Sequence, residues 1–96
     1  DYIGSITLDK LLIEAANIVG AEKVKIINIK NAERLETYVI EGKSGSGEVT
    51  LNGPAARKVQ KGDVIIIISY AQMEMEQAKI FNPTLIFPNE KNNLLE

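Results

Sequence analysis

The sequence predicts a small, mainly β domain whose strands form a closed or nearly closed barrel. About six short β-prone runs recur at roughly 8–15-residue intervals, a spacing typical of small barrels. Only two or three short helical segments lie between these runs. The chain has 96 residues, enough for one modest hydrophobic core but not for two. We therefore expect a single domain over residues 1–96.

The first β-prone run contains the pair Gly4-Ser5, on which the predicted chemistry depends. Glycine adopts backbone conformations that are closed to other residues, so Gly4 permits a strained peptide before Ser5. A serine hydroxyl held against the preceding carbonyl is placed to attack its own backbone. The alternative is an ordinary turn or bulge that carries a surface serine.

Asp9 follows this run and suits the N-cap position of a helix. Lys10 and Glu14 lie on the outer face of the predicted helix. The apolar residues recur at helical spacing, namely Leu11, Leu12, Ala15, Ala16 and Val19. We expect the helix to run to about residue 17 or 19 and to end at Gly20, the usual position for a glycine.

Two strands are expected next, over residues 24–28 and 34–40, joined as a hairpin by a turn at residues 30–33. The glycine- and serine-rich segment 42–47 superficially resembles a phosphate-binding loop. It lacks the spacing of a P-loop and no strong helix follows, so we interpret it as a hairpin tip.

The second half of the chain predicts further short elements. Residues 48–51 are expected to form a strand, and Pro54 suits the first position of a helical turn. Residues 64–68 are an unbroken β-branched run, typical of a strand covered on both faces. Residues 74–79 predict one or two helical turns, and residues 84–87 predict the last strand. The tail from Pro88 onward is polar, and we expect its end to be frayed.

Composition narrows the possible functions. A net charge of −2 and a pI near 5.2 give no electrostatic footprint for nucleic acid or an anionic membrane. The chain has no Cys, His or Trp, which excludes disulfides, a Cys nucleophile, a Ser-His pair and His- or Cys-based metal sites within these residues. No apolar run approaches the roughly 18 residues needed to span a bilayer. We expect no metal, nucleic-acid or membrane partner.

Four segments combine into a recognisable pattern. They are Tyr2-Ile3-Gly4-Ser5-Ile6-Thr7, the segment from Asn31 to Tyr38, the segment from Leu51 to Arg57 and the segment from Gly62 to Tyr70. Their order and spacing resemble the pyruvoyl-dependent aspartate 1-decarboxylases, from Tyr2 to about Phe87. A lone Gly-Ser pair is weak evidence, whereas this combination at this spacing is specific.

The resemblance implies a six-stranded double-psi β-barrel, a homo-tetramer and a cytoplasmic enzyme. It also implies a proenzyme that cleaves itself between Gly4 and Ser5. Residues 1–4 would then end the β chain, residues 5–96 would form the α chain, and Ser5 would become a covalent pyruvoyl group. In this family that group forms a Schiff base with L-aspartate, which loses carbon dioxide to give β-alanine for pantothenate and coenzyme A synthesis.

The resemblance further implies a role for each matching residue. Ser5 would supply the pyruvoyl group, and Tyr38 would reprotonate the decarboxylated intermediate. Self-cleavage would involve Gly4, Ser5, Thr37 and Asn52. Substrate contacts would come from Arg34, Thr37, Gly53, Pro54 and Ala55.

The chemistry of the residue types agrees with these roles. A Thr37 hydroxyl could donate to the oxyanion that forms when Ser5 attacks Gly4. The planar fork of Arg34 suits the retained side-chain carboxylate of aspartate. The phenol of a tyrosine is mostly protonated at neutral pH, so Tyr38 can donate a proton. Gly53 and Ala55 can offer backbone N–H groups to an anion, which Pro54 cannot.

Each of these residues also has an ordinary interpretation. Arg34 on a strand is often a solvated surface residue, Tyr38 is often half-buried core, and Asn52-Gly53 is often a turn. Strand alternation puts Arg34 and Tyr38 on one face and Thr37 on the other. For Thr37 and Tyr38 both to approach Ser5, we expect a bulge or an edge-on meeting with the Gly4-Ser5 loop.

Family chains begin about twenty residues earlier, with a strand that carries a Lys and a His near the substrate. Since this sequence begins at Asp1 without Met, we expect a segment upstream. The sequence runs unbroken through Gly4-Ser5, as in an unprocessed precursor or in a sequence that joins both fragments. Two other functions stay open: a pyruvoyl decarboxylase of another amino acid, and a small barrel that binds or assembles without catalysis.

Overall fold

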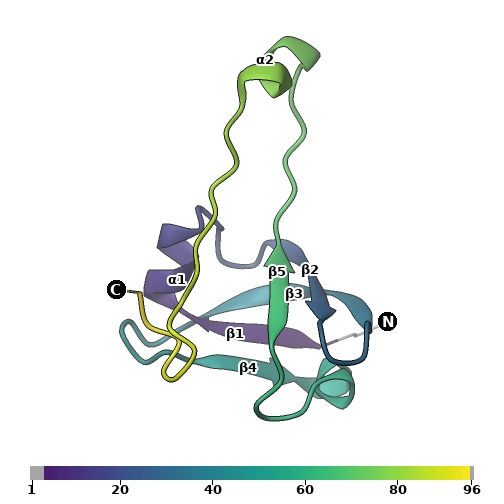
Figure 1. Ribbon diagram of the computed structural model, residues 1–96, viewed down its shortest axis with the longest axis vertical. Helices are drawn as coiled ribbons and strands as arrows, with labels where there is room; N and C mark the ends of the chain where they lie inside the picture. Colours follow the sequence, from purple (N-terminus) through teal and green to yellow (C-terminus); the bar gives the residue numbers. More distant parts are fainter. Residues whose placement is uncertain (1–3, 96) are drawn as a thin grey trace.

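The computed structural model describes residues 4–95, so the expectations that fall on residues 1–3 and on Glu96 lie outside the described residues. The main feature is one curled, five-stranded sheet in the order β4-β1-β3-β2-β5 (Figure 1). The predicted mainly β class is confirmed. The strands are β1 (Ser5–Asp9), β2 (Lys23–Asn28), β3 (Arg34–Gly42), β4 (Val49–Asn52) and β5 (Ile65–Ile68).

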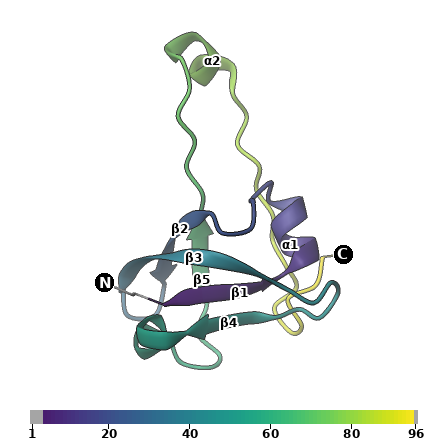
Figure 2. The same ribbon diagram turned by 180° about the vertical axis from the view of Figure 1, so that it is seen from behind.

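Strand β1 is inserted between β3 and β4, as Figure 2 shows. It runs parallel to β3 and antiparallel to β4. The loop at residues 43–48 therefore joins two strands that do not pair with each other. The prediction of a simple hairpin tip at residues 42–47 was wrong, because β1 takes the position that a hairpin partner would occupy.

The hairpin of β2 and β3 is confirmed, with an antiparallel register that pairs Val24 with Thr37. Strand β5 pairs antiparallel with the other edge of β2. Ile66 in β5 is 46% exposed and Ile65 only partly buried, so the predicted covering of this strand on both faces is wrong within the described chain.

The first helix, α1 (Lys10–Ala15), begins as predicted, because the carboxylate of Asp9 accepts a hydrogen bond from the backbone N–H of Leu11. The helix is shorter than predicted. Asn17 has a φ of 61°, which ends the helical path before Gly20 is reached. The predicted helical turn at Pro54 is confirmed as the 3-10 helix η1 (Gly53–Lys58), with proline in its first turn.

The hydrophobic core lies between the sheet and α1. Alternation along β2 turns every second side chain inward, and β3 does the same with Thr37 and Val39. The buried core residues are Ile6, Leu8, Ile13, Val24, Ile26 and Val39.

After β5 the chain leaves the sheet as a long arm, residues 69–88, with α2 (Met75–Ile80) at its tip (Figure 1). No residue of α2 is buried. The predicted helix at 74–79 is confirmed within one residue at each end. The predicted strand at 84–87 is wrong, because this segment lies on the returning half of the arm and pairs with none of the strands within residues 4–95. The described residues therefore form five strands of the expected six.

Candidate active site

The candidate site is centred on Ser5, the first residue of β1. Because β1 lies between two strands, Ser5 has a partner on each side. It pairs with Tyr38 of β3 in the parallel register and with Asn52 of β4 in the antiparallel register. Segments that are far apart in the sequence therefore meet at the start of β1.

The side-chain amide of Asn52 joins β4 to β1. Its Nδ2 donates a hydrogen bond of 3.0 Å to Ser5 Oγ and another of 3.0 Å to Thr7 Oγ1. Ser5 and Thr7 are two positions apart on β1, so their side chains lie on the same face. Ser5 is 5% exposed, so its hydroxyl oxygen is both buried and held by a donor from the neighbouring strand.

Gly4 is buried against the start of η1. Its φ is +97°, a conformation that disfavours residues with a side chain. A Cβ at this position would overlap the carbonyl oxygen of Asn52 and would lie 3.1 Å from the backbone nitrogen of Ala55. The absence of a side chain thus lets the backbone just before Ser5 approach η1. The prediction that Gly4 permits an unusual conformation here is confirmed.

Thr37 and Tyr38 lie on opposite faces of β3, as the alternation predicts. Thr37 is fully buried, whereas Tyr38 is 49% exposed. Tyr38 pairs with Ser5 in the parallel register, and Thr37 directly precedes Tyr38 on the opposite face of β3. The pairing of β1 with β3 runs without interruption from Ser5 to Asp9, so it contains no bulge.

The hydroxyl of Thr37 has an unusual environment. Its Oγ1 is buried and has no hydrogen-bond partner within residues 4–95. A buried hydroxyl without a partner costs on the order of 1–3 kcal/mol, so native proteins rarely keep one. Such a group is a candidate for a functional role.

Arg34 is exposed and lies on the same face of β3 as Tyr38, at the beginning of the strand. Four residues of extended chain span about 13 Å, so the structure does not bring the backbone of Arg34 next to Ser5. Glu36 lies between Arg34 and Tyr38 on this face and forms an ion pair of 3.3 Å with Lys23.

The segment Gly53-Pro54-Ala55 forms the first half of η1. Ala55 is 3% exposed, and its Cβ would lie 3.2 Å from a Cβ added at Gly4. Gly53 and Pro54 are exposed. The start of η1 therefore lies directly beside the Gly4-Ser5 peptide. This arrangement agrees with the grouping of these residues in the sequence pattern.

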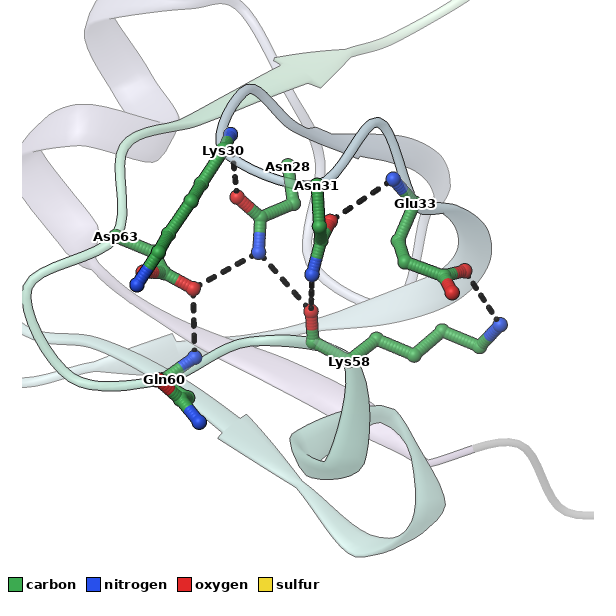
Figure 3. Close-up of polar contacts among 7 residues, drawn as sticks. All are labelled: Asn28, Lys30, Asn31, Glu33, Lys58, Gln60 and Asp63. Atoms are coloured by element: carbon green, nitrogen blue, oxygen red, sulfur yellow. Dashed lines mark hydrogen bonds and ion pairs between the residues drawn. The ribbon is translucent and has the colours of Figure 1, made fainter.

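A polar cluster at the far end of η1 holds this helix to the sheet (Figure 3). Asn28 occupies an inward-facing position at the end of β2 and is fully buried. Its Nδ2 donates to the carbonyl oxygen of Lys58 at 3.0 Å and to Asp63 Oδ2 at 2.9 Å. Its Oδ1 accepts from the backbone N–H of Lys30 at 3.0 Å. Asn28 thus fixes both the end of η1 and the turn before β5.

Asp63 completes this cluster. The backbone N–H of Gln60 donates to its carboxylate at 2.8 Å. This bond, the one from Asn28 and the charge of Lys30 hold the pKa of Asp63 below its ordinary value, against a smaller opposing effect of burial. A second link between the same segments is the ion pair of Lys58 with Glu33, at 3.0 Å.

Asp9 holds the opposite end of β1. Burial by itself raises the pKa of its carboxyl group, but backbone N–H donors from Gly47, Leu11 and Gly45 outweigh burial, and the pKa lies below its ordinary value. The two loop donors lie 2.9 Å from the carboxylate. Asp9 therefore caps α1 and also anchors the loop between β3 and β4.

Three residues of this region were not predicted from the sequence: Thr7, Asn28 and Asp63. Thr7 belongs to a segment of the sequence pattern, but the sequence indicates no role for its side chain. A polar residue at the end of the apolar alternation of β2 was the available signal for Asn28. Nothing in the local sequence indicates that Asp63 would accept from a residue of β2, because that contact depends on strand pairing.

Among residues 4–95, none of the helices has both the length and the apolar character required to cross a membrane.

Comparison with known proteins agrees with this geometry. A family model described as aspartate decarboxylase matches residues 1–95. A Flavobacterium psychrophilum protein named aspartate 1-decarboxylase is 65% identical over 96 residues, which are 100% of this chain and 83% of that protein. Proteins of the same name from Christiangramia forsetii and Cytophaga hutchinsonii are 62% and 57% identical. The two alignments include 100% and 98% of this chain, and 83% and 82% of the length of the respective relatives. The chain therefore belongs to the aspartate decarboxylase family.

Proposed function

We propose that this chain is a self-processing aspartate 1-decarboxylase, which converts L-aspartate to β-alanine and carbon dioxide. The proposal includes cleavage between Gly4 and Ser5 and conversion of Ser5 to a covalent pyruvoyl group. Family membership supports the decarboxylase activity, and the names of the relatives support aspartate as the substrate. The surroundings of Ser5 support the self-processing step.

The observation that carries the proposal is a buried serine that accepts a hydrogen bond from a neighbouring strand and follows a glycine with positive φ. Asn52 donates to Ser5 Oγ at 3.0 Å, and the preceding Gly4 has a φ of +97°. A second Gly-Ser pair, Gly45-Ser46, provides an internal comparison. Gly45 also has a positive φ, of +80°, but Ser46 is exposed and donates to the carbonyl oxygen of Lys43 at 2.6 Å. Only the first pair combines burial with a side-chain donor aimed at the serine oxygen.

In the first step Ser5 Oγ attacks the carbonyl carbon of Gly4. The peptide C–N bond breaks, an ester forms between Gly4 and Ser5 Oγ, and the hydroxyl proton ends on the Ser5 nitrogen. The Asn52 amide stabilises negative charge on Oγ as the proton leaves. The buried hydroxyl of Thr37 would donate to the oxyanion on Gly4, a contribution typically worth about 3 kcal/mol.

The ester then undergoes elimination. Loss of the Ser5 Cα proton breaks the Cβ–Oγ bond and releases the Gly4 carboxylate. Addition of water and loss of ammonia leave a ketone at the new N-terminus. The ketone is small and planar, so it needs little room. The buried position of Ser5, with the small residues Gly4 and Ala55 nearby, therefore fits it. When present, the pyruvoyl group supplies an electron-withdrawing carbonyl that accepts the electron pair left by carbon dioxide.

Residues of this chain would bind the substrate and move its proton. Tyr38, half-exposed on the face of Ser5, would donate a proton to the carbon that loses carbon dioxide. The backbone N–H groups of Gly53 and Ala55 would bind a carboxylate. Arg34 would hold the retained carboxylate only if its side chain extends back along β3 toward Tyr38.

The finer description of fold and assembly is also a proposal. The insertion of β1 between β3 and β4 supports a double-psi barrel, since a psi motif consists of two connected strands with a third between them. The arm at residues 69–88 carries exposed apolar side chains that a homo-tetramer would cover. They are Tyr70, Met75, Ile80, Phe81, Leu85 and Phe87. A cytoplasmic role in pantothenate synthesis rests on the family resemblance alone.

The decisive experiment compares Ser5→Ala with Ser46→Ala. Intact mass of the denatured wild-type protein should reveal a chain that starts at residue 5 and is lighter by one ammonia than the serine-initiated chain. Ser5→Ala should remain uncleaved and form no β-alanine, while Ser46→Ala should match the wild type. Decarboxylation by the Ser5→Ala protein would contradict the proposal. Parallel assays with L-glutamate and L-asparagine test the alternative of another amino-acid substrate.

A further inference from the structure

Thr7 shares the side-chain amide of Asn52 with the reactive serine. Both hydroxyl oxygens, Ser5 Oγ and Thr7 Oγ1, lie 3.0 Å from Asn52 Nδ2. From this arrangement we infer that Thr7 is a positioning residue for self-cleavage, which acts by fixing the Asn52 amide against Ser5. The inference rests on the proposed self-processing and adds a residue to it.

The amide nitrogen of asparagine carries two hydrogens, so it can donate to both oxygens at once. The terminal torsion of asparagine is broad, and one hydrogen bond leaves the amide free to turn about its Cβ–Cγ bond. A second hydrogen bond, to an oxygen on the same face of β1, restricts that rotation. Thr7 therefore determines how steadily the donor of Asn52 points at Ser5 Oγ.

Thr7 is itself held in place on its other side. A Cβ added at Gly42 would lie 3.1 Å from Thr7 Cγ2, so the methyl group of Thr7 fills space that a side chain at Gly42 would need. A β-branched side chain has few accessible χ1 rotamers. With the methyl group next to Gly42, the hydroxyl is directed to Asn52. The positions of both branches make threonine, rather than serine or valine, the best fit.

The two branches can be separated by substitution. Thr7→Val keeps the branched shape and removes the acceptor, whereas Thr7→Ser keeps the acceptor and removes the methyl group. Thr50, the exposed partner of Thr7 on β4, offers a matched control for a Thr→Val change on the same pair of strands. Asn52→Ala removes the donor itself and supplies the background for a double-mutant cycle.

The test measures the self-cleavage rate of the full chain, synthesised in a cell-free system and sampled over time by intact mass. Thr7→Val should slow cleavage about tenfold, as expected for the loss of one aligned hydrogen bond. Thr7→Ser should stay within about threefold of the wild type, and Thr50→Val should match it. In the Asn52→Ala background, Thr7→Val should have no further effect, because there is no amide left to position. If the Thr7 hydroxyl had a merely structural role, its removal in Thr7→Val would lower the melting temperature of the uncleaved chain. We expect the uncleaved Thr7→Val and Thr7→Ser chains to have the same melting temperature.

The outcomes are distinguishable. If the wild type cleaves and Thr7→Val cleaves equally fast, the inference about Thr7 is overturned while the proposed function stands. Additive effects of Thr7→Val and Asn52→Ala would also overturn it, since the two residues would then act independently. If the wild type itself stays intact, the proposed self-processing fails and the inference fails with it.

Discussion

The side-chain amide of Asn52 lies 3.0 Å from the hydroxyl oxygen of Ser5, although 47 positions separate the two residues in the sequence. The contact exists because β1 and β4 are antiparallel neighbours that pair Ser5 with Asn52. Three of the predictions below concern the neighbourhood of this contact, and the fourth concerns Asp9 at the opposite end of β1.

Replacing Thr37 with valine should separate stability from self-cleavage. Valine keeps the shape of threonine but removes a buried hydroxyl that has no partner within residues 4–95. The free energy of unfolding of the uncleaved chain should therefore stay the same or rise by about 1 kcal/mol. Cleavage should slow by at least about 100-fold if the hydroxyl stabilises the oxyanion on Gly4. Urea unfolding and intact mass measure the two effects.

Thr37→Ser, which keeps the hydroxyl, is the matched control and should still cleave. A Thr37→Val chain that cleaves at the wild-type rate would remove Thr37 from the oxyanion role.

Replacing Gly4 with alanine should slow cleavage because the new Cβ clashes with neighbouring atoms, and not only because of the positive φ. Gly62 has nearly the same φ, +95° against +97°, but a Cβ there would meet no atom within 4 Å. Gly62→Ala should lose about 1–3 kcal/mol of stability and cleave normally. Gly4→Ala should lose more stability and cleave slowly, because its Cβ would push β1 away from Asn52. Equal effects of the two variants on cleavage would rule out the clash.

Replacing Tyr38 with phenylalanine should spare cleavage and impair turnover. The ring is half-exposed, so removing its hydroxyl should change stability little. Formation of β-alanine should fall by at least about 100-fold, the usual scale for loss of a general acid. Wild-type turnover in Tyr38→Phe would exclude Tyr38 as the proton donor.

The acid stability of the protein should depend on Asp9. Its pKa is lower in the folded chain than in the unfolded chain, so the unfolded state binds the proton more tightly. The ionised Asp9 carboxylate therefore contributes its full stabilisation above the ordinary aspartate pKa of about 3.9. This stabilisation is lost as the pH falls through the pKa of Asp9 in the folded chain. Asp9→Asn should unfold at lower urea than the wild type at neutral pH.

The difference between Asp9→Asn and the wild type should shrink between about pH 5 and pH 3, as the wild-type carboxylate takes up a proton. Glu14→Gln, an exposed change of the same charge on α1, is the control and should show no such convergence. A gap between Asp9→Asn and the wild type that stays constant over this range would contradict the linkage.

Much of the local structure could be predicted from the sequence, because it depends on neighbouring residues. Asp9 before an apolar helical pattern indicates an N-cap, and Pro54 after Asn52-Gly53 indicates a helical start. Alternation along β3 separates buried Thr37 from half-exposed Tyr38. Each of these signals spans only a few residues, and each was confirmed.

The early end of α1 is set by the backbone of Asn17, but the other errors occurred where pairing or burial decides the outcome. Residues 84–87 have the composition of a strand, yet they lie on an arm away from the sheet and pair with no strand in the described part of the chain (Figure 1). Segment 42–47 resembles a hairpin tip, yet β1 separates the strands that it joins. A strand needs a neighbour to satisfy its backbone, and the sequence of the segment does not say which neighbour it has.

The sequence by itself determined most of the local elements, the spacing of the motifs and the resemblance to a decarboxylase family. It contains two Gly-Ser pairs and does not distinguish them through local backbone preference, because Gly4 and Gly45 both adopt a positive φ. Tertiary structure decided that Ser5 is buried beside Asn52 while Ser46 stays exposed. The physical reason is the insertion of β1 between β3 and β4, which surrounds one serine with two neighbouring strands and leaves the other in a loop.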